Sequence, residues 1–144
     1  MPATRFEDMS SAEMVEFVAR RTSGDMQFTC TQPSPEVAWG IRHIVENHAD
    51  GLRLSELAEA ARMSKFHFLR RFREETGMTP GTFLQHVRIC NAMLKLSETN
   101  QHIRDVARDV GYRDPTSLSR AFHRMTGRPP YQYRRRSRHK RRSL

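Results

Sequence analysis

The sequence predicts an all-α protein in which two helix-turn-helix subdomains are joined by a long linker helix. Residues from about 80 to 98 have the hydrophobic periodicity of one continuous helix. The segments on either side, 54–72 and 103–122, repeat one pattern of residues. Each copy predicts a short helix, a tight turn and a second helix of about ten residues, which is the helix-turn-helix arrangement.

The linker helix has a clear start and one apolar face. Thr79 is suited to cap it, and Pro80 is suited to its first position. Apolar residues then recur at spacings of four, three and four, at Phe83, Val87, Cys90 and Leu94. A helix of about 19 residues is roughly 28 Å long.

The two flanking copies can be aligned residue by residue. The run LSELA at 54–58 matches IRDVA at 103–107, and FLRRF at 68–72 matches LSRAF at 118–122. The copies are 49 residues apart at the first pair of runs and 50 at the second, so the second copy has one extra residue in its turn.

Caps and turns differ between the copies. Ser55 and Ser64 are expected to cap the two helices of the first copy, and Asp114 the second helix of the second copy. The second copy has Gly111 in its turn, where the backbone becomes left-handed, but the first copy has Arg62. The first turn therefore either carries about 1 kcal/mol of strain or has another conformation.

Angular position on the second helix of each copy separates core residues from outward residues. At 100° per residue, Phe68 and Phe72 point inward, as do Leu118 and Phe122. The opposite face is where a DNA major groove would lie. The candidates for reading bases there are Phe66, Leu69, Arg70, Thr116, Ser119 and Arg120. The candidates for contacting phosphates are Lys65, His67, Arg73, Arg113, His123, Arg134, Arg135 and Arg136.

The chain divides into three segments, and the second contains both copies. Residues 1–34 form an N-terminal extension and linker, in which Ser10 and Ser11 could cap a short helix that ends at Gly24. This extension is either flexible or a docking arm. Residues 35–136 form the domain, beginning with a helix whose Trp39 is expected in the core. Residues 137–144 form a basic tail.

The charge of the chain is concentrated at its C-terminal end. The net charge is +9 over 144 residues, with a pI of about 10.7, which is typical of a nucleic-acid-binding protein. Seven basic side chains lie in residues 134–144, and removing them from the total of +9 leaves +2. This run has no apolar periodicity and is expected to be disordered when free.

Several functional classes lack support in the sequence. Cys90 lies on the apolar stripe and Cys30 in the linker, with no paired Cys or His spacing for zinc, so neither a metal nor a cofactor is expected. The seven histidines are scattered and are interpreted as surface or phosphate-facing groups. No secretory signal and no apolar run of about 18 residues is present, which favours the cytoplasm and excludes a membrane partner.

About 100 residues, from 36 to 135, resemble the DNA-binding domain of the AraC/XylS family of bacterial transcription regulators. The most specific match is in the second copy, at Val110-Gly111-Tyr112, Leu118-Ser119-Arg120-x-Phe122 and Gly127-x-x-Pro130-x-x-Tyr133-Arg134. In the first copy the matching residues include His67-Phe68, Arg70-x-Phe72 and Gly77-x-x-Pro80. Leu69 departs from the family, in which a polar residue is usual. It could contact a thymine methyl group or pack against the neighbouring helix.

The resemblance implies a function and an architecture. It implies about seven helices, with two recognition helices in successive major-groove turns of double-stranded DNA. It also implies a nucleoid-associated transcription regulator that is not an enzyme, and an activator that contacts RNA polymerase. The absence of a sensor domain resembles the short stand-alone members, which bind as monomers.

Three other interpretations remain at this point. The chain could be a fragment of a longer ligand-responsive regulator. It could be a general nucleic-acid or RNA-associated protein that acts through its arginine-rich tail. A DNA-repair enzyme with this domain would need a reactive cysteine cluster, and Cys30 has no neighbouring Cys or His.

Overall fold

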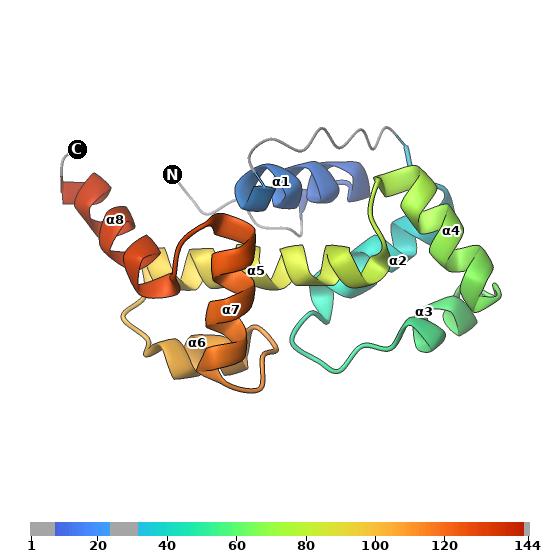
Figure 1. The fold of residues 1–144 in the computed structure, drawn as a ribbon. Coiled ribbons are helices and arrows are strands. Elements are labelled where there is room, and N and C mark those ends of the chain that lie inside the picture. The colour runs from blue at the N-terminus through green and yellow to red at the C-terminus, as the bar shows by residue number, and fades with distance from the viewer. Residues whose placement is uncertain (1–7, 24–31, 143–144) are drawn as a thin grey trace.

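The computed structural model describes residues 8–23 and 32–142, and these residues form eight helices and no strand (Figure 1). This agrees with the all-α prediction, with one helix more than about seven. The expected end of the first helix at Gly24, and Cys30, lie outside the described residues. No described helix is long and apolar enough to cross a membrane. The helices are α1 (Ser11–Ser23), α2 (Pro35–Glu46), α3 (Leu54–Ala60), α4 (Lys65–Thr76), α5 (Pro80–Glu98), α6 (Ile103–Asp109), α7 (Pro115–Thr126) and α8 (Pro130–Arg142).

Helix α5 has the bounds that the sequence predicts and runs through the centre of the molecule (Figure 1). The Thr79 side chain accepts a hydrogen bond of 3.2 Å from the backbone N–H of Thr82, as expected of an N-cap. Cys90 is fully buried on this helix, and burial raises the pKa of its thiol to about 11.

Two separate hydrophobic cores form on α5. The first contains Phe68, Phe72 and Phe83, whose rings follow one another at centroid distances of 5.9 and 6.0 Å. The second contains Leu118 and Phe122, together with residues from α6 and from the C-terminal half of α5. Each core therefore belongs to one helix-turn-helix subdomain, and α5 contributes to both.

Helix α1 is docked in the first core, so the described part of the N-terminal segment is a docking arm and not a flexible extension. Met14, Val15 and Val18 are buried, and α1 packs against α2, α5 and α7 (Figure 1). The Ser10 side chain accepts a hydrogen bond from the Glu13 N–H, and the Glu13 carboxylate accepts one from the Ser10 N–H. This reciprocal pair is a capping box.

A buried polar pair links α1 to α5. The Thr22 hydroxyl donates a hydrogen bond to the Val18 carbonyl and lies 2.5 Å from Nδ1 of His86. If the one hydrogen of that hydroxyl is directed at Val18, Nδ1 of His86 is the donor in this pair. The interpretation of every histidine as a surface or phosphate-facing group is therefore wrong for His86. Burial lowers the pKa of His86, which favours the neutral ring.

Trp39 is not a core residue, contrary to the prediction. Its side chain is 39% exposed and stacks on the His43 ring at a centroid distance of 4.8 Å. The buried residues Val37 and Ile41 are each two positions from Trp39, and two positions correspond to 200° of rotation on a helix. Trp39 therefore points away from the core, on the opposite face of α2.

Ser55 does not cap α3. The N-cap position is Arg53, which makes no side-chain capping hydrogen bond, and Ser55 lies in the first turn, exposed. The turn that follows resolves the question of Arg62, whose φ of +56° places it in the left-handed region. Arg62 thus adopts the strained conformation that Gly111 adopts in the second copy, where φ is +102°.

The basic run at the C-terminal end is helical up to Arg142, whereas the sequence pattern predicts disorder. Arginine and lysine are good helix formers, and the start of α8 is anchored. The Tyr133 ring packs edge-on against Phe122 at 5.5 Å, and Nε of Arg134 donates a hydrogen bond of 3.1 Å to the Leu96 carbonyl. Farther along, the Arg138 guanidinium donates to the Asn100 side chain.

Candidate nucleic-acid interface

Helix α4 is the second helix of the first motif, and its core face is as predicted. It begins at a Ser64 cap, whose hydroxyl accepts a hydrogen bond of 3.2 Å from the His67 N–H. It ends at Gly77, where φ is +84°. Phe68 and Phe72 are fully buried, and this fixes which side of the helix faces solvent.

The solvent-facing side of α4 brings four of the predicted residues together. Phe66 is 77% exposed, an unusual position for a large aromatic side chain. Together with neighbouring residues it lines a shallow groove of about 540 Å³. The residues that line this groove are Phe66, Leu69, Arg70, Arg73, Glu74 and Thr79.

Leu69 is half-buried beside Phe66 in this groove, and it is not among the residues that form or border the first core. Its position therefore favours an outward contact over packing against a neighbouring helix. Lys65 and His67 are exposed in the first turn of α4, where its backbone N–H groups are directed outward.

Helix α7 is the second helix of the second motif. The Asp114 carboxylate caps it by accepting a hydrogen bond of 2.7 Å from the Ser117 N–H. This hydrogen bond lowers the pKa of Asp114. Leu118 and Phe122 are fully buried, as predicted, and α7 ends at Gly127, where φ is +81°.

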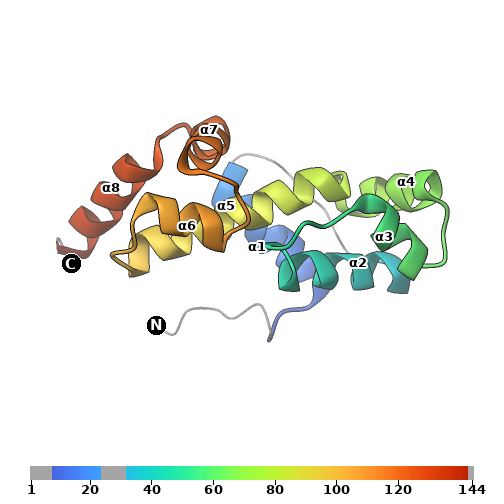
Figure 2. The same cartoon turned by 90° about the horizontal axis from the view of Figure 1, so that it is seen from below.

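The outward face of α7 is polar and contains no acidic residue. Thr116, Arg120 and His123 are exposed, and Ser119 is half-buried. Arg113 is exposed just before the cap. Figure 2 shows α4 and α7 along the same edge of the molecule, at opposite ends of α5. The two outward faces can therefore approach one extended ligand from the same side.

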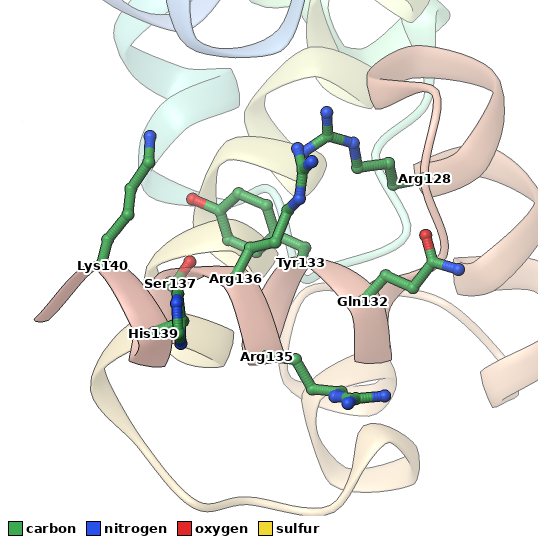
Figure 3. Close-up of a pocket in the computed structure, with 8 residues that line it drawn as sticks. All are labelled: Arg128, Gln132, Tyr133, Arg135, Arg136, Ser137, His139 and Lys140. Carbon is green, nitrogen blue, oxygen red and sulfur yellow. The ribbon is translucent and has the colours of Figure 1, made fainter. Parts of the chain in front are cut away.

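A basic groove lies on α8, next to the end of α7. Its volume is about 840 Å³. Figure 3 shows Arg128, Arg136 and Lys140 on one side of α8 and Arg135 on the other. The residues that line the groove are Arg128, Gln132, Tyr133, Arg135, Arg136, Ser137, His139 and Lys140. Arg135 and Arg136 were predicted from the sequence to contact phosphates, but Arg128, which directly follows Gly127, was not.

Arg134 differs from its neighbours Arg135 and Arg136. Its side chain is half-buried against the end of α5, and Nη2 is buried with no hydrogen-bond partner among the described residues. The guanidinium thus serves the α5–α8 packing in this structure. A phosphate contact by Arg134 stays a prediction.

A family model described as a helix-turn-helix domain, of the AraC type, matches residues 57–136. This match covers more than half of the chain. The chain belongs to the AraC-type helix-turn-helix family. The family assignment confirms the resemblance drawn from the sequence, and its residues span both motifs and the first part of α8.

The relatives of this AraC-type chain are transcription regulators. The MmsAB operon regulatory protein of Pseudomonas aeruginosa is 38% identical over 100 residues, which are 69% of this chain and 33% of that protein. The regulator MtrA of Neisseria gonorrhoeae is 31% identical over 94 residues, which are 65% of this chain and 31% of MtrA. The chain thus spans about a third of the length of these relatives.

Solved AraC-type structures have the same fold. The DNA-binding domain of AdpA, solved in complex with a target DNA, matches with a TM-score of 0.71 and 31% identity, over 75% of this chain and 97% of that domain. The C-terminal domain of AraT from Geobacillus stearothermophilus matches with a TM-score of 0.70 and 29% identity, over 73% and 88% of the two chains.

Proposed function

We propose that this protein is a sequence-specific double-stranded DNA-binding transcription regulator. The observation that carries the proposal is the pair of second helices, α4 and α7, which lie along one edge of the molecule (Figure 2) and each expose an arginine, Arg70 or Arg120. Helix α5, which connects the two motifs, has 19 residues and is about 28 Å long. Successive major-groove turns of B-DNA are about 34 Å apart, so each helix can enter one turn.

The two classes of predicted side chain have different roles in this proposal. Outward residues of α4 and α7 read base edges, which specify sequence, and other residues on and beside these helices bind phosphates, which fix position. The base readers are Phe66, Leu69, Arg70, Thr116, Ser119 and Arg120. The phosphate contacts are Lys65, His67, Arg73, Arg113, His123, Arg134, Arg135 and Arg136.

The chain is proposed to act as a monomer in the bacterial nucleoid, because a single chain supplies both recognition helices. It is further proposed to activate transcription by contacting RNA polymerase. Support for activation comes from relatives such as RhaR of Klebsiella pneumoniae, a transcriptional activator that is 41% identical over 69 residues, or 48% of this chain and 25% of RhaR.

Arg70→Ala and Arg120→Ala should each weaken binding to a specific site while leaving the fold intact. A bidentate contact between an arginine and a guanine contributes about 1–3 kcal/mol of discrimination against the wrong base. Both side chains are exposed, so their removal should barely affect stability. Affinity for a site selected from random DNA and for a scrambled site, together with thermal melting, measures both effects.

Arg20→Ala is the matched control for these two variants. Arg20 is also an exposed arginine, but it lies on α1 and pairs with Glu16 at 2.6 Å. Arg20→Ala removes the same charge as the other two variants. Because Arg20 is not on α4 or α7, its loss should have little effect on discrimination between the two sites. If Arg70→Ala and Arg120→Ala discriminate between the two sites as well as Arg20→Ala does, these arginines do not read bases.

Deleting residues 135–144 should weaken binding to specific and unrelated DNA by similar factors. Basic side chains on α8 attract phosphates but carry no base contact in this proposal. The slope of log K against log salt should become shallower by about 0.9 for each phosphate that the shortened protein leaves unneutralised. A salt titration on both DNAs gives both quantities.

A second variant separates charge from helix structure in this experiment. The deletion also removes the contact between Arg138 and Asn100. Replacing Arg135, Arg136 and Lys140 with glutamine keeps the helix and that contact and removes only charge.

The same variant tests the alternative of a general nucleic-acid-binding protein that acts through the basic groove. That alternative would be supported if the wild type bound RNA and unrelated DNA with equal affinity and the glutamine replacements abolished both interactions.

A further inference from the structure

Arg88, in the middle of α5, contacts both helix-turn-helix subdomains. Its Nε donates a hydrogen bond of 2.8 Å to the His48 carbonyl, and its Nη2 donates one of 3.3 Å to the Asp50 carbonyl. These carbonyls lie in the loop between α2 and α3, in the first subdomain. The guanidinium carbon also lies 5.6 Å from the centroid of the Tyr112 ring, in the turn of the second motif.

Tyr112 is held in place from the other side by α5. Its hydroxyl donates a hydrogen bond of 2.5 Å to Oε1 of Gln85. Gln85 and Arg88 are three residues apart on α5 and thus on one face of the helix. The turn of the second motif is therefore tied to α5 by a hydrogen bond and by a cation–π contact.

The two subdomains also meet directly at Gly111. A Cβ atom at this position would lie 2.8 Å from the His48 carbonyl oxygen and 2.8 Å from Nε of Arg88. It would lie 3.1 Å from Cα of Ala49. Only a residue without a side chain allows the turn of the second motif to approach the loop of the first so closely.

This junction lies outside both hydrophobic cores. Neither Arg88 nor Gly111 belongs to a core, and Tyr112 is only partly buried at the border of the second. Each core packs within its own subdomain, so the angle between subdomains depends on α5, on the contact of α1 with α7, and on this junction. A polar contact that joins two separately packed units can set their orientation without being needed for either to fold.

We propose that Arg88, with Gly111 and Tyr112, determines which spacing the protein accepts between two DNA boxes. A box is the group of base pairs that one recognition helix, α4 or α7, contacts. Arg88 is a positioning residue in this proposal, since it acts through the placement of α4 and α7. The inference rests on the proposed function, in which these two helices enter successive turns of the major groove. One inserted base pair moves the second box by about 3.4 Å and rotates it by about 35°. A rigid junction therefore penalises the insertion, and a loosened junction tolerates it.

The test compares wild-type protein and Arg88→Gln on three DNA duplexes. One contains the two boxes that the wild-type protein selects from random DNA, and the others have one or two base pairs inserted between the boxes. The wild-type protein should lose about tenfold or more in affinity on the first insertion, as expected when the contacts of one box are displaced. Arg88→Gln should bind the selected duplex more weakly and lose distinctly less on insertion.

Lys95→Gln is the matched control on the same helix. Lys95 forms an ion pair with Asp109 at 3.5 Å, within the second subdomain, and makes neither of the hydrogen bonds by which Arg88 holds the loop between α2 and α3. Lys95→Gln removes one positive charge, as Arg88→Gln does. The sensitivity of the Lys95→Gln protein to box spacing should equal that of the wild type. Equal sensitivity of Arg88→Gln and wild type would overturn the inference.

A pair of glycine variants keeps the test decisive if Arg88→Gln melts below the assay temperature. Gly111→Ala and Gly127→Ala both place alanine in the left-handed region, at φ of +102° and +81°. Only Gly111→Ala would meet Arg88 and His48, because nothing lies within 4 Å of a Cβ at Gly127. Gly111→Ala should change the spacing preference and Gly127→Ala should not; identical preferences would overturn the inference.

The wild-type measurement also separates this inference from the proposed function. If the wild-type protein protects only one box in a footprint, or is indifferent to spacing, the proposal of two recognition helices fails. If it protects two boxes at one strict spacing, that proposal stands, and the variants alone decide the role of Arg88.

Discussion

Phe72→Ala and Phe122→Ala should each lower the free energy of unfolding by about 3–5 kcal/mol. Both rings are fully buried. Phe72 packs against Phe68 and Phe83 in the first core, and Phe122 packs against Tyr133 in the second. Domains of this size have a total stability of about 5–15 kcal/mol. We expect both variants to melt well below the wild type, or to aggregate, in thermal and urea unfolding.

Phe66→Ala provides the matched control for this prediction. The same side chain is removed from α4, but Phe66 is exposed, so stability should change by less than about 0.5 kcal/mol. Its effect should be on DNA binding instead. A Phe72→Ala protein that melts normally and loses only specific binding would contradict the assigned facing of α4.

Val18→Asp should destabilise the protein by several kcal/mol, the second of the two largest effects. Val18 is fully buried on α1, against α5 and α2. A carboxylate there must either lose its hydration or become protonated, and both are costly. The protein must then release α1 or rearrange around it, and release exposes apolar surface on α5. Thermal melting and the accessibility of the Cys90 thiol to a labelling reagent measure these consequences.

Arg20→Asp places the same side chain on the exposed face of α1. The Arg20 side chain is 76% exposed and pairs only with Glu16 among the described residues. Its loss should cost about 1 kcal/mol or less. If Val18→Asp melts like Arg20→Asp, α1 is not an integral part of the first core in solution.

The sequence was sufficient to predict the elements whose signals are local. Helix α5 has its cap, its proline and its apolar spacing within one stretch, and its bounds are as predicted. The repeat between the two motifs identified Phe68, Phe72, Leu118 and Phe122 as inward residues, and all four are fully buried. Once these residues are inside, helical geometry alone determines which side chains of α4 and α7 face outward.

Features that depend on contacts distant in sequence could not be predicted. The apolar side of α1 indicated an amphipathic helix, but the sequence does not show that this helix packs against α5, with Thr22 hydrogen-bonded to His86. Arg88 belongs to the polar side of α5 by periodicity, and its contacts with His48 and Tyr112 exist only in the folded chain. The helical state of the basic run depends likewise on the contacts of Tyr133 and Arg134.

The division of the interior into two cores on a shared α5 has a consequence for engineering new regulators. Substitutions at distant sites without shared partners usually have additive energetic effects. The outward residues of α4 and α7 lie over different cores, so libraries at the two helices can be screened separately and the best variants combined in one chain. Orthogonal pairs of regulator and operator can thus be assembled one box at a time, provided that Arg88, Gly111 and Tyr112 are kept constant.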